Sequence, residues 1–292
     1  MSSIQLQIRD NSRKTFLAMA FLTTLIGILG SALSYIFQWG LTGTGWFLII
    51  AGCIDFIAFF FSDRIVLKAS GAKQLEKNQA PELFLIIEKL CMQENLPLPK
   101  LYLINDTSMN AFATGRNTKH AAIAVTRGIV EKLSEDELTG VIAHELSHIQ
   151  NNDIRTMAII TVLVGGISLI ADMFWYSSFA TKSQEKDRSG MIAWIGVGLA
   201  IFAPLTAMLI QLFISRKREL IADATAAHMT QKPKALASAL QKISMNVIMP
   251  THTSRATAHL YFSSPSRGEA LLDKLFSTHP PIEERINLLM NM

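Results

Sequence analysis

The sequence predicts a mainly α-helical integral membrane protein with four transmembrane helices and a water-exposed domain that contains a small β-sheet. Half of the 292 residues are hydrophobic and only 17% are charged. The mean hydropathy of +0.30 is higher than that of an average soluble chain. Four apolar runs are separated by stretches of ordinary soluble composition. The net charge of +4 is too small to indicate a nucleic-acid-binding surface, so we expect no nucleic-acid partner.

Residues 1–63 are predicted to form an N-terminal transmembrane hairpin. The first span, over about 16–39, follows a basic segment and is long enough to cross a hydrocarbon core of about 30 Å. It exceeds the apolar part of a signal peptide, so we expect it to be retained. The glycine-containing stretch Trp39–Trp46 is expected to be the turn, with its tryptophans at the membrane interface. The second span is expected over about 46–61.

Residues 64–156 are predicted to form the first part of the water-exposed domain. An amphipathic helix is expected over 81–95, and short strands are expected over 101–104 and 121–126. The strand over 121–126 comes shortly before the helix that carries the chemistry. We expect it to be the edge strand beside the functional site, onto which an extended polypeptide adds through backbone hydrogen bonds.

The pattern His-Glu-x-x-His is the strongest functional signal in the chain. Ser134 and Glu137 form a capping box that predicts a helix start just before it. Residues four apart on a helix share one face, so the imidazoles of His144 and His148 can grip one metal ion. Glu145 can take a proton from a water at the open metal position. The pattern is typical of a zinc hydrolase, most often a peptidase.

A catalytic zinc site uses three protein ligands, so a further ligand is needed. Glu219 is the best candidate, because Asp223 lies four residues later on the same helical face and can accept the second ring N–H of a ligating histidine. Arg218 is interpreted as the guanidinium partner of a nearby carboxylate. An ordinary amphipathic helix with an acidic pair is the alternative reading of this segment.

Several motifs in this order resemble the HtpX family of bacterial membrane zinc proteases, which are relatives of the CAAX prenyl endopeptidases. The matching stretches are Asn110–Gly115, His144–His148, Arg218–Asp223 and Thr278–Arg285. The resemblance covers nearly the whole chain. It implies a zincin-like metalloprotease domain at the cytoplasmic face of the plasma (inner) membrane of a bacterium or archaeon. It also implies that the substrates are misfolded or damaged membrane proteins and that the protein serves quality control and the stress response.

The resemblance also implies roles for individual residues. It implies one Zn²⁺ per chain, held by His144, His148 and Glu219. Glu145 is then the general base, and His279 donates a hydrogen bond to the oxyanion of the tetrahedral intermediate. Asn110 either holds a substrate carbonyl or is a turn residue.

Residues 157–214 are predicted to form a second transmembrane hairpin, with spans over about 157–176 and 191–214. Because this hairpin separates His148 from Glu219, these ligands can meet only if both of its ends emerge on the same side of the bilayer. Four spans counted from a cytoplasmic N terminus place both ligand segments in the cytoplasm. The positive-inside rule agrees, because the cytoplasmic flanks carry Arg64, Lys68, Arg155 and the run Arg216–Arg218.

Residues 215–292 are predicted to complete the domain. A helical region over 224–245 is expected to break at Pro233, and residues 246–268 are expected to form a loop near the cleft. The proline pair Pro280–Pro281 is expected to begin the last helix.

Two carboxylates, Asp55 and Asp172, lie inside predicted spans. We interpret them as packing residues, and a functional role is the alternative. The two cysteines, Cys53 and Cys91, do not have the spacing of a metal site or a disulfide framework, which fits a reducing compartment.

Three other functions remain as alternatives. An intramembrane protease would carry its motif within a spanning helix, but charged residues precede this motif and polar residues follow it. A non-catalytic zinc-containing scaffold would need a closed fourth ligand, for which the sequence offers no cysteine. A CAAX-type enzyme would have more spans than this chain.

Overall fold

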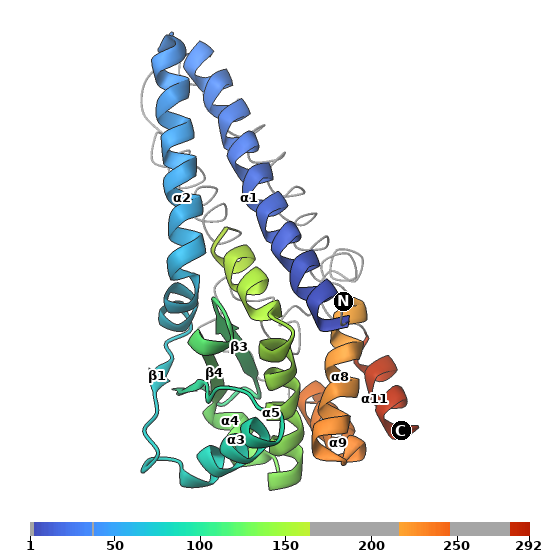
Figure 1. The fold of residues 1–292 in the computed structure, drawn as a ribbon. Helices are drawn as coiled ribbons and strands as arrows, with labels where there is room; N and C mark the ends of the chain where they lie inside the picture. The colour runs from blue at the N-terminus through green and yellow to red at the C-terminus, as the bar shows by residue number, and fades with distance from the viewer. Residues whose placement is uncertain (1–2, 37, 164–215, 246–280) are drawn as a thin grey trace.

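The structure is a computed structural model that describes residues 3–36, 38–163, 216–245 and 281–292. Within these ranges the protein is mainly helical, with one four-stranded mixed sheet (Figure 1). Several expectations lie outside the described residues: those for Asp172, for His279, for the 246–268 loop and for most of the second hairpin.

Two long helices form the N-terminal hairpin and project from the rest of the protein (Figure 1). Helix α1 spans Ser3–Ile36 and helix α2 spans Gly40–Ala69. In the part of the chain that is described, α2 is the one helix long and apolar enough to cross a membrane. The apolar stretch recognised within α1 is shorter, Thr15–Ile28.

The predicted turn over Trp39–Trp46 is wrong. The chain turns within Gln38–Gly40, where Gln38 and Gly40 have positive φ angles of 59° and 62°, and α2 begins at Gly40. The other glycines of this stretch do not bend the chain. A Cβ atom at Gly43 would collide with the side chain of Ser34, so this glycine allows α1 and α2 to approach closely.

The sheet has the strand order β1-β2-β4-β3. Its strands are β1 (Lys73–Gln74), β2 (Lys100–Ile104), β3 (Ala111–Gly115) and β4 (Ala121–Thr126). Strands β2 and β4 are parallel, whereas β1–β2 and β3–β4 are antiparallel. The strands expected over 101–104 and 121–126 are therefore confirmed.

The expectation that 121–126 is the edge strand is wrong. This strand, β4, lies between β2 and β3, and all six of its residues are buried. Ile123 and Val125 face the main core, while Ala122 and Ala124 face a second core on the opposite side of the sheet. Side chains that are apolar on both faces suit an interior strand. Among the described strands, the edge beside the candidate site is β3.

Helices cover one face of the sheet and form the main core with it. They are α3 (Pro81–Gln93), the short η1 (Thr118–His120), α4 (Arg127–Lys132), α5 (Glu135–Gln150), α8 (Arg216–Thr230), α9 (Pro233–Met245) and α11 (Ile282–Met290). The helix expected over 81–95, the break at Pro233 and the helix start after Pro281 are confirmed. Side chains of α3, α5, α8, α9 and α11 pack together with one face of the sheet.

The opposite face of the sheet packs against the base of the N-terminal hairpin. Val66 and Leu67 at the end of α2 share a core with Phe112 of β3 and Ala124 of β4. Residues 153–163 are also helical and pack against α1 and α2. The domain that carries the candidate site is thus joined directly to the apolar helices.

Candidate metal centre

Helix α5 is fixed at its N terminus by the capping box that the sequence predicts. The Ser134 backbone N–H donates to Glu137 Oε2 at 2.8 Å, and the Glu137 N–H donates to Ser134 Oγ at 3.4 Å. Glu137 also accepts from Ser238 Oγ at 2.6 Å and from Lys242 Nζ at 2.7 Å, both on α9. Burial alone would raise the pKa of Glu137, but these hydrogen bonds lower it to about 2. The start of the helix is therefore anchored to α9.

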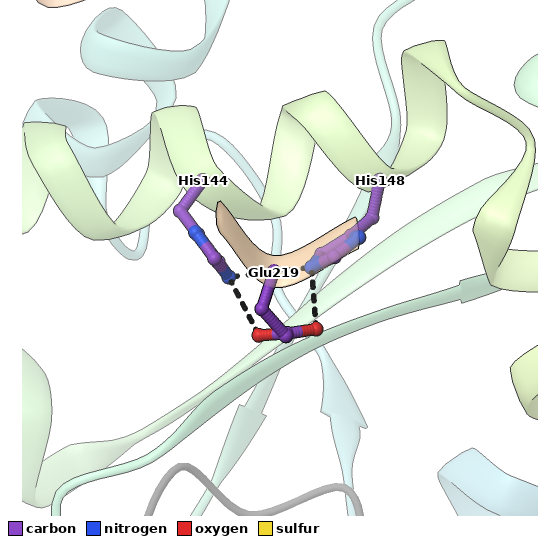
Figure 2. Close-up of side chains that lie close together, drawn as sticks. All are labelled: His144, His148 and Glu219. Atoms are coloured by element: carbon purple, nitrogen blue, oxygen red, sulfur yellow. Dashed lines mark hydrogen bonds and ion pairs between the residues drawn. The ribbon is translucent and has the colours of Figure 1, made fainter. Parts of the chain in front are cut away.

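Three side chains predicted as ligands converge from α5 and α8 (Figure 2). His144 Nε2 and His148 Nε2 lie 3.2 Å apart. Glu219 Oε2 lies 3.7 Å from His144 Nε2, and Glu219 Oε1 lies 3.6 Å from His148 Nε2. The two imidazoles project from the same side of α5 towards the carboxylate of Glu219, as Figure 2 shows.

The spacing of these donor atoms fits a tetrahedral metal site. With zinc–ligand bonds of about 2.0–2.1 Å, neighbouring ligands in a tetrahedron lie about 3.4 Å apart. The two imidazole nitrogens lie 3.2 Å apart, close to this value, and each lies 3.6–3.7 Å from a different oxygen of Glu219. One ligand atom from each of the three residues lies within 4.8 Å of the other two. Two imidazole nitrogens and one carboxylate form a donor set that zinc favours in catalytic sites, with a fourth position open.

Each imidazole has a carboxylate at its other ring nitrogen. His144 Nδ1 lies 2.9 Å from Asp223 Oδ1, as the sequence predicts for a ligating histidine. His148 Nδ1 lies 3.3 Å from Asp153 Oδ2, a residue that the sequence analysis did not single out. A carboxylate at Nδ1 fixes the tautomer in which Nε2 keeps its lone pair and could bind a metal ion.

Two arginines contact these carboxylates. Arg218 Nη1 lies 3.5 Å from Asp153 Oδ1, so Asp153 is a carboxylate partner of the kind predicted for Arg218. Arg285 donates to both oxygens of Asp223 at 2.7 Å and lies 3.8 Å from Glu219. No role was predicted for Arg285, although it is the last residue of the motif Thr278–Arg285.

The buried charges of the site favour a cation. Around the two histidines, the described residues supply four carboxylates and two guanidinium groups, namely Glu145, Asp153, Glu219, Asp223, Arg218 and Arg285. Burial lowers the pKa of His144, but hydrogen bonds to Asp223 and Glu219 outweigh it and raise this pKa to about 9. A divalent cation bound at Nε2 of both histidines and at Glu219 would take the place of protons on the imidazoles.

Glu145 lies beside the ligands and is 4% exposed. Burial raises the pKa of its carboxyl group, while the charges of His144 and His148 act in the opposite direction. A backbone hydrogen bond from Ala113 of β3 also reaches this carboxyl group. The candidate base is thus held between the metal helix and the edge strand.

Asn110 lies immediately before β3 and is 1% exposed. Its backbone N–H donates to Thr126 Oγ1 at 2.9 Å, and its carbonyl accepts from the Thr126 N–H at 2.9 Å. These bonds secure the start of the edge strand. The predicted contact of the Asn110 side chain with a substrate remains a prediction.

The fold and this centre define a membrane metallopeptidase. The family model "Peptidase family M48" matches residues 77–292, which include all the residues of the centre, and the chain belongs to this family. Similar curated proteins carry the name "Protease HtpX homolog". That of Thermococcus sibiricus is 41% identical over 282 residues, which cover 94% of each chain. That of Desulforapulum autotrophicum is 40% identical over 278 residues, or 94% of this chain and 88% of that protein.

A solved structure shares the fold. The crystal structure of S. mikatae Ste24p matches with a TM-score of 0.52 at 22% sequence identity, covering 98% of this chain and 67% of that chain. The match to the M48 family model and to the HtpX homologues confirms the predictions of a metalloprotease and of membership in the HtpX-like group.

Proposed function

We propose that the protein is a zinc-dependent endopeptidase that hydrolyses misfolded or damaged membrane proteins at the cytoplasmic face of a bacterial or archaeal plasma membrane. In this role it would serve quality control and the stress response. The observation that carries the proposal is the convergence of His144, His148 and Glu219 beside the buried carboxyl group of Glu145.

The residues of the centre divide the chemistry among them. A zinc ion on the three ligands would lower the pKa of a bound water and polarise the substrate carbonyl. Glu145 takes a proton from the attacking water and passes it to the leaving amine. Asp153 and Asp223 keep both imidazoles in the tautomer that presents Nε2. His279 is proposed to donate a hydrogen bond to the oxyanion.

The edge strand β3 supports binding of an extended polypeptide. Hydrogen bonds join Asn110 to Thr126 of β4, so the alternate residues Ala111, Ala113 and Gly115 turn their backbone groups away from β4. A substrate added along this edge would be held mainly by its main chain, with Asn110 at one end of the strand. Such binding depends little on the side chains of the substrate, which supports broad specificity.

The proposed topology has four spans, with the N terminus and the centre in the cytoplasm. Helix α2, the α1–α2 pairing and the packing of residues 153–163 against both helices support it. Single cysteines at Ser183 and Lys234, in a variant without Cys53 and Cys91, test the orientation. A membrane-impermeant maleimide should label position 183 in intact cells and position 234 only after permeabilisation. The reverse pattern would overturn the proposed orientation.

The activity is tested with Glu145→Gln and the control Glu135→Gln, a change at an exposed position of the same helix. With purified protein and casein, Glu145→Gln should keep about one zinc per chain and lose about 10²–10⁴-fold in cleavage. Glu135→Gln should cleave like the wild type. A chelator should stop wild-type cleavage, and added zinc should restore it. Undiminished cleavage by Glu145→Gln would remove the assigned base, and bound zinc without any cleavage would favour a scaffold.

The position of the motif argues against an intramembrane protease. Helix α5 has 16 residues, and it packs against β3, α8 and α9 within the mixed α/β domain. A helix packed in this way supports the proposal that the motif lies in a water-exposed domain and not in a spanning helix.

A further inference from the structure

The side of the centre around His148 contains an ion pair between two distant segments. Asp153 Oδ2 faces His148 Nδ1 at 3.3 Å, and the other oxygen of Asp153 lies 3.5 Å from Arg218 Nη1. Asp153 is 4% exposed, and the Arg218 side chain is 15% exposed. The contacts place Asp153 between the imidazole and the guanidinium group.

The ion pair joins the two ends of the segment predicted to enter the membrane. Asp153 begins the helical residues 153–163, which pack against α1 and α2. Arg218 lies in the first turn of α8, 65 positions later in the sequence. The entry to the predicted hairpin 157–214 and the exit from it therefore meet at Asp153, one contact away from a predicted zinc ligand.

The backbone is shaped to bring Asp153 back to His148. Helix α5 ends at Gln150, and Asn152 has a φ of 55°, in the left-handed region that asparagine tolerates better than most residues. This local reversal places an acidic side chain five positions after His148 at the far nitrogen of the same imidazole.

The carboxylate beside His144 has shorter contacts with its arginine than the carboxylate beside His148 has. Its carboxylate, Asp223, receives two hydrogen bonds of 2.7 Å from Arg285, which is 1% exposed. The Arg218–Asp153 contact is longer, and the Arg218 side chain is 15% exposed against 1% for Arg285. The position of Asp153 at Nδ1 makes it suited to orient the imidazole of His148.

We propose that Asp153 is a positioning residue for His148 and that Arg218 holds Asp153 in place. The affinity for zinc then depends on the two ends of the 157–214 segment being held together. This inference rests on the zinc site of the proposed function, and it adds a coupling between the membrane hairpin and the ligand geometry.

The zinc affinity of the full-length protein in detergent micelles, measured by competition with a chromophoric chelator, tests the proposal. Asp153→Asn keeps the shape of the side chain, removes its charge, and should weaken zinc binding about 10–100-fold. Arg218→Met should weaken it in the same direction but less, and Arg218→Lys should lie closer to the wild type. The melting temperature of the metal-free protein is measured alongside, because removing one partner of a buried pair also destabilises the fold. The order of zinc affinities should hold among the variants that stay folded at the temperature of the measurement.

The exposed pair Lys232–Asp136 provides a matched control. It joins the first turn of α5 to the residues after α8 at 2.6 Å, with both side chains 58% exposed and remote from the ligands. Asp136→Asn should leave the zinc affinity unchanged. An equal loss in Asp136→Asn and Asp153→Asn would show a general effect of charge and would overturn the proposal.

A double-mutant cycle tests whether Arg218 acts through Asp153. The variant with both Asp153→Asn and Arg218→Met should bind zinc no more weakly than Asp153→Asn alone. Additive losses of zinc affinity would show that Arg218 acts independently of Asp153. If Asp153→Asn does not fold, an unchanged affinity in Arg218→Met overturns the coupling by itself.

The controls also separate this inference from the proposed function. A wild-type protein that binds no zinc would refute the zinc site. A wild type that binds zinc, together with unchanged binding in both single variants, would refute only the role of Asp153 and Arg218.

Discussion

Arg285 donates two hydrogen bonds of 2.7 Å to the carboxylate of Asp223, across 62 positions of the sequence. Asp223 in turn faces His144 Nδ1 at 2.9 Å. The short helix α11 thus delivers a buried guanidinium group to the partner of a predicted zinc ligand, and the final residues of the chain help to order the centre.

We predict that Arg285→Met destabilises the protein by about 3 to 5 kcal/mol, because it leaves a buried carboxylate without its charge partner. Arg285→Lys should destabilise the protein less, since it keeps the charge but loses the bidentate hydrogen bonding to Asp223. Thermal unfolding in detergent measures both. Arg127→Met, which removes the exposed Arg127–Glu131 pair, is the control and should change stability by about 0.5 kcal/mol or less. Equal melting of Arg285→Met and the wild type would contradict the prediction.

Removal of the third ligand should remove the metal. Glu219→Ala leaves two imidazoles, which do not complete a three-ligand catalytic site. Atomic absorption on the purified protein should find zinc far below one per chain, and cleavage should be lost. Glu131→Ala, at an exposed position on α4, should keep both. Full zinc occupancy in Glu219→Ala would point to a different third ligand.

The outward-facing N–H of Ala113 should matter for cleavage but not for metal binding. Proline lacks this N–H and is tolerated in an edge strand where the N–H faces away from the sheet. Ala113→Pro should therefore keep zinc and lose cleavage at least about tenfold, the loss expected for one hydrogen bond to a charged group. Ala113→Gly keeps the N–H and should remain active. Because this N–H reaches the carboxyl group of Glu145, full activity of Ala113→Pro would argue against a role for the Ala113 N–H in holding the base.

The Glu137 anchor should make stability depend on acid pH. The pKa of Glu137 is lowered from 4.5 to about 2 in the folded state, so its contribution is complete above about pH 4.5 and is lost as the pH falls towards 2. Glu137→Gln should cost about 2 kcal/mol at pH 7, through lost capping and charged hydrogen bonds. The difference between the wild type and Glu137→Gln should shrink between pH 4.5 and 2. Melting temperatures at pH 7, 4 and 2.5 measure this, and a constant difference would contradict it.

Local signals account for the elements that the sequence predicts well. The capping box Ser134–Glu137 sets the start of α5, and helical spacing places His144 and His148 on one face. Strand β4 has the predicted bounds because its apolar, branched residues suit an interior strand. The break at Pro233 also follows from local chemistry.

The elements that were missed depend on distant contacts. Strand β3 has the sequence Ala-Phe-Ala-Thr-Gly, in which only Phe112 and Thr114 favour a strand, and pairing with β4 completes it. Asp153 reaches His148 because the backbone reverses at Asn152, and no periodic pattern shows this. Arg285 finds Asp223 only through the packing of α11. Asp153, which follows the second histidine, and Arg285, which ends the last motif, are nevertheless visible in the sequence as candidate partners of the ligands.

The predicted zinc ligands come from two segments that lie far apart in the sequence, and this has a consequence for biosynthesis. His144 and His148 leave the ribosome before Asp153, and Glu219 follows only after the stretch 164–215 has been translated. A nascent chain that ends within this stretch carries two imidazoles and no third ligand. The three-ligand site can therefore assemble only after Glu219 has been translated, so the proposed cleavage of other polypeptides can begin only at that point.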